Sequence, residues 1–361
     1  MVVAKPRLLL AGERTQQHDQ NNGDTLKQNP LRHHPVLLNP ERFLRCVTGL
    51  ADVLSVPEKR HQPPEERDDY GNREAADQHH QKERHDLNLR KAGAGTARNF
   101  GKIEQNYRIA GVGVAVPGLV DTVDGRVLIA PHLGWRDCAL TSTLARVLHF
   151  PVYAGNDASL AAIAESLFGA ARGAKDLVYL NGSASGIGGG LIIGGSPLRG
   201  TSGYAGELGH TLVNSNGVRC HCGRIGCLET EVSMSRLLRV LGLPRADLDD
   251  LDIALGVSRD PQVLREVMRQ IDFLSVAISD FVNMFDPKMV VLGGFLGSLL
   301  SVGRERLAEA VSVSSIGSLG HAVLLERAQL RSRLMIVGAA ELAFAGLLDD
   351  PAGFVRGRTG V

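Results

Sequence analysis

The sequence changes character near residue 105, and this change limits which part of the chain can form a packed core. Only six of the 42 glycines lie before residue 100, but seven of the 12 histidines do. Segments 14–34 and 57–89 consist largely of Gln, His, Arg, Asp and Glu. Such segments offer too little apolar surface to offset the entropy that is lost on folding. We therefore expect residues 1–105 to be mostly disordered, without a recognisable domain.

One segment of this polar region has a helical pattern. Within residues 41–56, apolar side chains recur at the spacing that places them on one helix face. They are Phe43, Leu44, Val47, Leu50, Ala51 and Leu54. The pattern predicts one amphipathic helix here, and at most one other helix before residue 106.

Composition excludes several classes of protein. The formal net charge is +1, which gives no global electrostatic reason to expect a nucleic-acid partner. The chain has no run of about 18 apolar residues and no secretory signal pattern, so we expect no membrane partner. Three of the five cysteines fall within eight residues, which is typical of a metal site in a reducing compartment. We expect a cytoplasmic protein.

After residue 108 the pattern alternates between strands and helices. Buried-strand patterns occur at 109–118, 151–154, 176–180, 191–193 and 289–292. Helical patterns occur at 141–150, after Asn156-Asp157, at 263–285 and at 338–348. In the helix after Asp157, the expected apolar face includes Leu160, Leu167 and Phe168. Strands that alternate with helices, with glycine turns at the strand ends, predict an α/β fold.

The most specific local pattern is His210-x9-Cys220-His221-Cys222-x4-Cys227. Three thiolates and one imidazole form a closed, tetrahedral structural zinc site. His221 lies between two ligands and should point away, so the spacing favours His210 as the fourth ligand. The competing interpretation is three reduced cysteines in a glycine-rich loop. The sequence predicts a structural Zn²⁺ ion.

Carboxylates and an amide surround this pattern. Glu207 lies three residues before His210, and Glu229 lies two residues after Cys227. Asn156 and Asp157 begin a predicted helix, where the helix dipole favours an anion. These side chains suit a polyhydroxylated ligand, and an ionised Asp157 could act as a general base. The competing interpretation of Asn156-Asp157 is a plain helix cap.

Two glycine-rich segments follow predicted strands and are weaker signals. The candidate phosphate-binding or nucleotide-binding residues are Ser185, Gly186, Gly188, Gly189, Gly293 and Gly294. Backbone N–H groups in such turns can approach a phosphate closely. A tight hairpin at the first segment, or a simple turn at the second, explains the glycines as well.

The order of these motifs resembles that of the ROK family, which contains repressors, open reading frames and sugar kinases. The segments that carry the resemblance are Val116-Pro-Gly-Leu-Val-Asp, Gly155-Asn-Asp-Ala, Ser185-Gly-Ile-Gly-Gly-Gly, Gly203-Tyr-Ala-Gly-Glu-Leu-Gly-His, Cys220-His-Cys-Gly-Arg-Ile-Gly-Cys-Leu-Glu and Asn283-Met-Phe-Asp-Pro-Lys-Met-Val-Val-Leu-Gly-Gly. The resemblance covers about residues 106–350. It implies an actin-like, ribonuclease-H-like pair of α/β lobes with a sugar in the cleft.

The resemblance also implies a domain organisation and roles for particular residues. Residues 106–173 would complete the N-terminal lobe, 174–335 would form the C-terminal lobe, and 336–361 would pack back on the first lobe. Asp157 matches the catalytic base of the kinases. The positions that match sugar-binding residues are Asn156, Asp157, Glu207, His210 and Glu229. Those that match zinc ligands are His210, Cys220, Cys222 and Cys227. A homodimer or homotetramer is implied.

Two departures separate this chain from a typical family kinase. Residues 1–105 lack the early Asp-x-Gly-x-Thr loop that holds the phosphates and metal of ATP, and Ala184-Ser185 replaces the usual Gly-Thr. The extra N-terminal length matches that of the repressors, but its content does not match a winged helix-turn-helix.

The sequence therefore favours a regulator that senses a sugar or sugar phosphate, with its DNA-binding part missing or unrecognisable. One alternative is a hexose kinase that uses ATP, Mg²⁺ and Asp157. A second alternative is an inactive remnant of such a protein.

Overall fold

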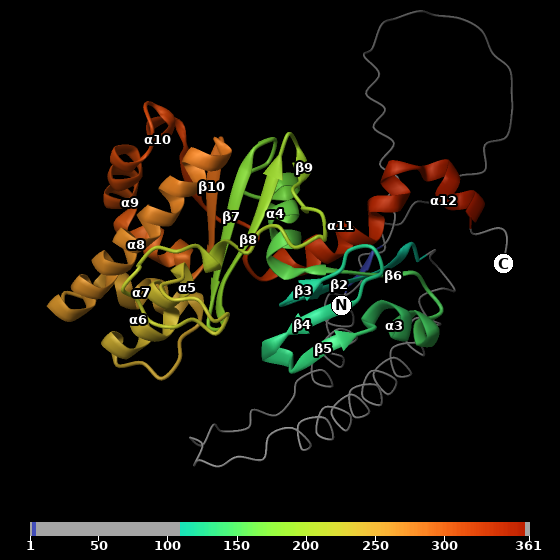
Figure 1. Ribbon diagram of the computed structural model, residues 1–361, viewed down its shortest axis with the longest axis horizontal. Helices are drawn as coiled ribbons and strands as arrows, with labels where there is room; N and C mark the ends of the chain where they lie inside the picture. Colours follow the sequence, from blue (N-terminus) through green and yellow to red (C-terminus); the bar gives the residue numbers. More distant parts are fainter. Residues whose placement is uncertain (1, 5–108, 358–361) are drawn as a thin grey trace, which may run out of the picture.

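The computed structural model describes residues 2–4 and 109–357. The predictions of disorder in residues 1–105 and of a helix at 41–56 concern residues that lie outside the described part. Within residues 1–105, the structure describes a short strand, β1 (Val2–Ala4). The described part forms two lobes that lie side by side (Figure 1). This arrangement is the α/β fold that the alternating pattern predicts.

The first lobe contains two three-stranded sheets and one helix. In the first sheet, ordered β1-β2-β6, strand β2 is antiparallel to β1 and parallel to β6. The second sheet, ordered β3-β4-β5, is antiparallel throughout. The remaining elements of this lobe are β2 (Gly111–Val116), β3 (Leu119–Val120), β4 (Val127–Ala130), η1 (Pro131–Leu133), β5 (Trp135–Cys138), α3 (Leu140–Leu148) and β6 (Val152–Asn156). Their apolar side chains form one buried cluster, which includes Val112, Trp135 and Leu144.

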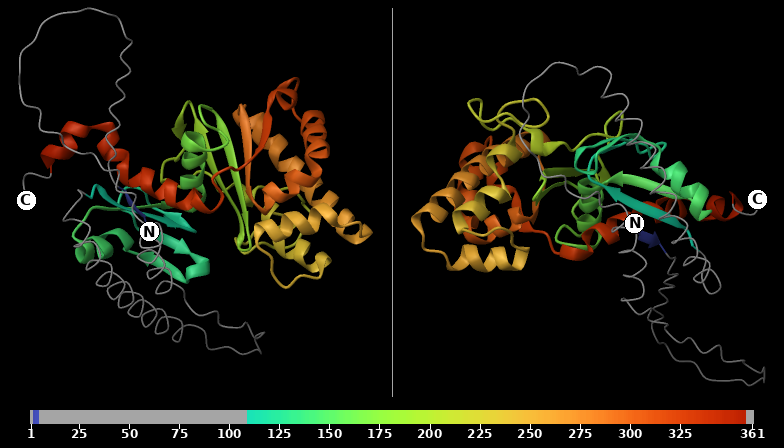
Figure 2. Two further views of the ribbon diagram at one scale, coloured as in Figure 1. Left: turned by 180° about the vertical axis from the view of Figure 1, so that it is seen from behind. Right: turned by 90° about the horizontal axis from the view of Figure 1, so that it is seen from below.

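A five-stranded mixed sheet lies at the centre of the second lobe. Its order is β11-β10-β7-β8-β9, with parallel pairing from β11 to β7 and antiparallel pairing from β7 to β9. The strands are β7 (Leu177–Ser183), β8 (Gly186–Ile193), β9 (Ser196–Pro197), β10 (Met289–Gly294) and β11 (Leu324–Arg327). Helices α8 (Pro261–Phe285) and α9 (Phe295–Ser314) lie on one face of this sheet, and α4 (Asp157–Phe168) lies on the other (Figures 1 and 2).

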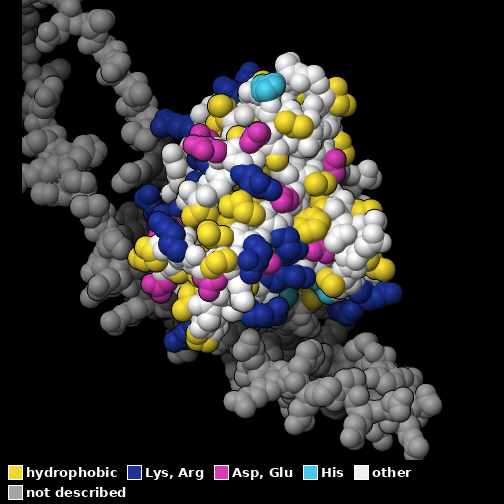
Figure 3. Space-filling view, turned by 90° about the vertical axis from the view of Figure 1, so that its left-hand side faces the viewer, with side chains coloured by type: hydrophobic (Ala, Val, Ile, Leu, Met, Phe, Trp, Pro, Cys, Tyr) yellow, Lys and Arg dark blue, Asp and Glu magenta, His cyan; other side chains and the backbone are white. Residues whose placement is uncertain are grey.

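Shorter elements complete the second lobe. They are η2 (Leu208–His210), α5 (Leu228–Glu231), α6 (Met234–Leu241), α7 (Leu248–Val257), α10 (Leu319–Ala322) and η3 (Arg331–Arg333). The outer face of the lobe carries basic, acidic and apolar side chains (Figure 3). In the part of the chain that the structure describes, no helix has the length and apolar character needed to cross a membrane.

Helix α8 shows how local sequence sets the bounds of an element. The Asp260 side chain accepts a hydrogen bond from the backbone N–H of Gln262, and Pro261 occupies the first helical turn. Both features favour a helix start. The helix ends where Asp286 adopts a left-handed conformation directly before Pro287, which cannot continue a helix. The predicted helix at 263–285 is therefore confirmed almost residue for residue.

Helix α11 (Leu334–Asp349) leaves the second lobe's sheet and packs on α4 and on β2 of the first lobe, and α12 (Pro351–Gly357) follows it (Figure 2). A Cβ atom at Gly338 would collide with the backbone of Leu160, and one at Gly113 would collide with the backbone of Ala339. Glycine is therefore needed at both positions for α11 to approach α4 and β2 so closely.

The structure corrects one detail of the expected packing. Leu167 and Phe168 were expected on the buried face of α4, but they are 45% and 55% exposed. The buried face consists mainly of small side chains, because α4 packs closely against glycines of β8. A Cβ atom at Gly190 would lie 2.6 Å from the Ala162 Cβ atom. Strands β3 to β5 were not anticipated, because each is at most four residues long.

Candidate functional site

A cleft of about 1240 Å³ lies between the two lobes. The first lobe contributes residues of β3 to β5 and the β6–α4 junction, and the second lobe contributes the β7–β8 hairpin and the segment around η2 and α5. The cleft brings together all five predicted ligand-binding side chains. They are Asn156, Asp157, Glu207, His210 and Glu229. Spacing in the sequence had suggested this group, and the fold places it on one surface.

The β6–α4 junction positions Asn156 and Asp157. Asn156 is the N-cap of α4, and its Oδ1 atom accepts a hydrogen bond of 2.9 Å from the backbone N–H of Ser159. Its Nδ2 atom donates to the carbonyl oxygen of Gly118 at 3.1 Å. Asn156 therefore performs the capping role, while Asp157 follows as the first helical residue and lines the cleft.

Burial changes the acidity of Asp157. It raises the pKa of this carboxyl group to about 6, against the pull of a hydrogen bond from the Ala158 N–H. The negative charge of Glu207 raises this pKa further, and His132 lowers it. A carboxylate with a pKa just below neutrality is ionised at pH 7 and can still accept a proton usefully. The side chain is thus suited to accept a hydrogen bond, or a proton, from a ligand hydroxyl.

Glu207, His210 and Glu229 lie close together on the opposite wall. The His210 Nε2 atom is 3.8 Å from Glu207 Oε2, and its Nδ1 atom is 3.5 Å from Glu229 Oε1. Burial also raises the pKa of Glu207. Glu229 is nearly buried, with 8% of its side chain exposed. Acceptor oxygens and one imidazole therefore converge on the cleft from the second lobe.

The three cysteines and His210 form a compact group that could hold a metal ion, with ligand atoms all within 4.8 Å of one another. The Cys222 and Cys227 sulfur atoms are 3.7 Å apart, and Cys220 Sγ is 3.6 Å from His210 Nδ1. Tetrahedral zinc with ordinary bond lengths would separate two sulfur ligands by about 3.8 Å. These two separations are close to those of a tetrahedral zinc site, although Cys220 Sγ also donates to Glu229 Oε1 at 2.9 Å.

His221 takes a different position from His210. It is about half exposed, and its Nδ1 atom lies 3.0 Å from Glu229 Oε1. His210, His221 and Glu229 form a second, overlapping group of potential ligands. Because His210 is the histidine grouped with the three cysteines, the arrangement agrees with the preference for His210 over His221.

The first glycine-rich segment forms the β7–β8 hairpin at the edge of the cleft. Ser185, Gly186, Gly188 and Gly189 all line the cleft, and the Ser183 and Ser185 hydroxyls are 2.8 Å apart. Gly188 packs closely against α4 and Gly189 against η2, so glycine is needed at both positions whether or not they bind a ligand. The hairpin interpretation is therefore correct for the backbone.

The second glycine pair lies apart from this surface. Gly293 and Gly294 end β10 and do not line the described cleft. A Cβ atom at Gly293 would lie 2.9 Å from the Asn181 side-chain oxygen, so glycine is needed there for packing.

Sequence reasoning missed many of the residues that line the cleft, among them His132 and Asn181. His132, in η1 of the first lobe, places its ring centroid 6.5 Å from that of His221 in the second lobe. Asn181, in β7, also lines the cleft and accepts a hydrogen bond of 3.3 Å from the Tyr179 hydroxyl. A lone histidine and a lone asparagine have no spacing pattern, so only the fold reveals their location.

Comparisons with known proteins agree with this arrangement. The model of the ROK family matches residues 96–345. A xylose repressor of Caldicellulosiruptor bescii is 31% identical over 261 residues, which cover 67% of this chain and 64% of the repressor. A glucokinase of Thermotoga maritima is 32% identical over 230 residues, covering 57% of this chain and 72% of the enzyme. The chain thus spans less than two thirds of the repressor that it matches.

Solved structures give the same picture. A ROK family transcriptional regulator, described as a homologue of the E. coli MLC protein, has a TM-score of 0.63 and 25% identity. The match covers 71% of this chain and 68% of the regulator. A ROK hexokinase from Thermus thermophilus has a TM-score of 0.59 and 32% identity, covering 72% of this chain and 87% of the enzyme. The two-lobed fold is therefore shared with both regulators and kinases.

Proposed function

The chain belongs to the ROK family, and on that premise we propose that it is the sugar-sensing body of a carbohydrate-responsive transcription regulator. One observation carries the proposal: five side chains that can accept hydrogen bonds converge from both lobes in one cleft. They are Asn156, Asp157, Glu207, His210 and Glu229. Vicinal hydroxyl groups of a sugar or sugar phosphate donate hydrogen bonds to such acceptors. Xylose repressors among the relatives support a regulator.

We assign the cysteine group a structural role in this site. A Zn²⁺ ion held by His210, Cys220, Cys222 and Cys227 would connect the segment that carries Glu207 to the loop that precedes Glu229. Four protein ligands leave no open position on the metal, which suits a structural ion rather than a catalytic one. The metal would hold two ligand-binding carboxylates in one rigid unit.

The proposed partners are a small sugar or sugar phosphate, a second copy of the chain and, if a DNA-binding part is present, DNA. A DNA partner is proposed because xylose repressors and an N-acetylglucosamine repressor are among the relatives, and assembly into a dimer or tetramer follows the family resemblance. Fluorescence anisotropy with fragments of the source genome tests the DNA partner. The proposal predicts binding that changes when sugar is added. Sugar binding without any DNA binding would restrict the function to sensing.

A hexose kinase is the second candidate, and the raised pKa of Asp157 favours it, because a general base works best near the operating pH. ATP and Mg²⁺ would then be cosubstrate and cofactor, with the β7–β8 hairpin near the phosphates. The missing Asp-x-Gly-x-Thr sequence in residues 1–105 argues against efficient turnover, because phosphoryl transfer depends on holding the phosphates in place.

A coupled assay for ADP release, run over a panel of hexoses, separates the two candidates. The regulator proposal predicts no turnover above background. Turnover that disappears in Asp157→Ala would establish the kinase instead. If the chain neither turns over nor binds any sugar, it is an inactive member of the family.

A further inference from the structure

Helix α5 consists of one turn, Leu228–Glu231, and carries carboxylates on two opposite sides. Glu229 lines the cleft, whereas Glu231 faces α8 and has only 5% of its side chain exposed. A single helical turn has too few backbone hydrogen bonds to fix its own orientation. Glu229 itself contacts Cys220 at 2.9 Å and His221 at 3.0 Å through Oε1. The contacts of Glu231 act beside these to hold the turn that presents Glu229 to the cleft.

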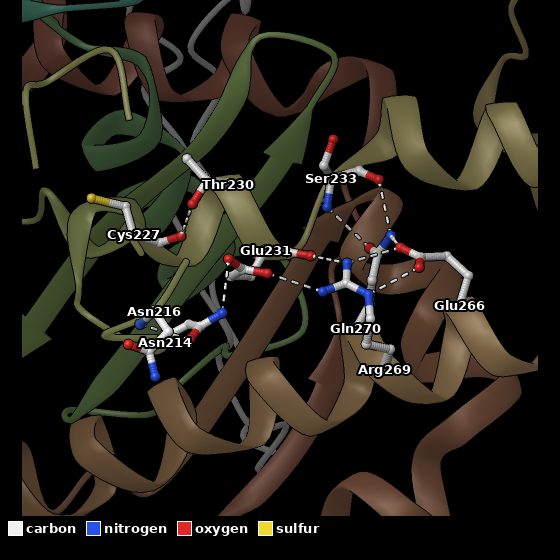
Figure 4. Close-up of polar contacts among 9 residues, drawn as sticks. All are labelled: Asn214, Asn216, Cys227, Thr230, Glu231, Ser233, Glu266, Arg269 and Gln270. Atoms are coloured by element: carbon white, nitrogen blue, oxygen red, sulfur yellow. Dashed lines mark hydrogen bonds and ion pairs between the residues drawn. The ribbon is translucent and has the colours of Figure 1, made fainter. Parts of the chain in front are cut away.

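Arg269 of α8 contacts Glu231 at two points (Figure 4). Its Nη1 atom donates to Glu231 Oε2 at 3.0 Å, and its Nη2 atom donates to the Glu231 backbone carbonyl at 2.6 Å. Side-chain and main-chain atoms of one residue are thus held by one planar guanidinium group. This geometry fixes the rotation of α5 more firmly than a single ion pair would.

The guanidinium group is itself held in place by its own helix. Glu266, three residues earlier, accepts from Arg269 Nε and Nη2, both at 2.9 Å. The fully buried Gln270 donates to the same Glu266 carboxylate at 2.8 Å and joins it to Ser233, which follows α5. These hydrogen bonds hold the Arg269 guanidinium group in the orientation in which it contacts Glu231. We call the contact between Arg269 and Glu231 the clamp.

The clamp also reaches the base of the cysteine loop. Asn214 Nδ2 donates to Glu231 Oε1 at 3.2 Å (Figure 4). The backbone of Asn214 bonds to Gly217, which precedes the three cysteines, and to Gly226, which directly precedes Cys227. Glu231 thus connects α8 with both the loop and α5.

We propose that Arg269 is a positioning residue for the ligand-binding carboxylate Glu229. It acts through Glu231, which sets the orientation of α5 and the base of the cysteine loop. The proposal rests on the proposed function for the role of Glu229 in sugar binding. The placement of α5 and the loop can be tested without any sugar.

The main variant is Arg269→Met, which removes the clamp and keeps much of the side-chain volume. Arg306→Met is the matched control. Arg306 of α9 forms a two-bond ion pair with Asp272 of α8, the helix that carries Arg269, but lies outside this network. Both members of that control pair are about half exposed. Both variants are made in the full chain.

Hydrogen exchange followed by mass spectrometry gives the first readout. In Arg269→Met, exchange in segment 211–232 should rise about tenfold, while exchange in β7 and β10 stays as in the unsubstituted protein. Arg306→Met should leave segment 211–232 unchanged. Equal exchange in the two variants, or a uniform rise across the molecule, would overturn the proposal. If Arg269→Met does not fold, Arg269→Lys replaces it in the same exchange comparison. Lysine keeps the positive charge but cannot make the two guanidinium contacts with Glu231.

A double-mutant cycle on D-xylose and D-glucose affinity gives the second readout. Arg269→Met should weaken binding about tenfold alone, but less than about twofold in a Glu229→Gln background. Equal losses in both backgrounds would mean that Arg269 does not act through Glu229. If the unsubstituted protein binds neither sugar, the proposed ligand class fails, and the exchange comparison still decides the positioning role.

Discussion

Asp157 illustrates how a functional residue can oppose stability. Its carboxyl group is partly buried at the start of α4, and backbone hydrogen bonds, including one from the Ala158 N–H, compensate only in part. Because burial raises its pKa from 3.8 to about 6 in the folded protein, the fold favours the protonated form. The contribution of the protonated Asp157 carboxyl group to stability is complete below pH 3.8 and is lost as the pH rises through about 6. Above that pH, the ionised group lowers the stability of the fold.

Asp157→Asn should therefore stabilise the protein at high pH. The amide cannot ionise, and its Oδ1 atom can keep the hydrogen bond from the Ala158 N–H. We expect the free energy of unfolding at pH 8 to rise by about 1–3 kcal/mol, with almost no gain near pH 4. Urea unfolding at both pH values measures this difference. A gain of equal size at the two pH values would show that ionisation of Asp157 is not the cause.

At the scale of elements, the contact between α4 and β8 holds the Asp157 end of the cleft against the second lobe. Gly190 has no room for a side chain: an added Cβ atom would lie 2.6 Å from Ala162 Cβ and 2.9 Å from the Ala158 carbonyl oxygen. We expect Gly190→Ala to lower the free energy of unfolding by about 1–3 kcal/mol, because overpacking must displace α4.

Gly256→Ala is the matched control for that substitution. Gly256 lies in α7 with open space around an added Cβ atom, so alanine there should be neutral or stabilise the protein by up to about 1 kcal/mol. Thermal or urea unfolding of both variants measures the contrast. Equal losses at Gly190 and Gly256 would show that the close approach of α4 to β8 is not needed.

The cysteine loop supports a second prediction at this scale. If metal binding folds the loop, removing the metal with a chelator should release Glu207 and Glu229 together and abolish sugar binding. Metal content and sugar affinity are measured on the same samples before and after chelation, and again after zinc is restored. Unchanged sugar affinity after verified metal removal would contradict the structural role of the loop.

Short-range patterns predicted much of the site, and long-range contacts explain what they missed. The Asn156-Asp157 helix start and the cysteine spacing involve neighbouring residues, so the sequence alone reveals them. The Glu231–Arg269 clamp joins residues 38 positions apart, and no local pattern marks either one. Similarly, the apolar spacing of α4 suggested that Phe168 is buried, because nothing in that helix reveals the glycine surface of β8.

For the whole molecule, the central feature is one cleft with functional groups from both lobes. Asn156 and Asp157 come from the β6–α4 junction, while Glu207, His210 and Glu229 come from segments on the other side of the cleft. The α/β fold and its family were predictable because the motifs occur in a characteristic order. The interlobe contact between His132 and His221 was not, because it depends on how the lobes are placed.

Isothermal titration calorimetry with D-xylose, D-glucose, N-acetyl-D-glucosamine and their phosphates tests the sugar site most directly. The unsubstituted chain is compared with Asp157→Asn, a variant expected to be at least as stable, so that lost binding cannot be attributed to unfolding. We expect saturable binding of at least one of these ligands to the unsubstituted chain and loss of that binding in the variant. Absence of binding by the unsubstituted chain, or equal affinity in both proteins, would contradict it.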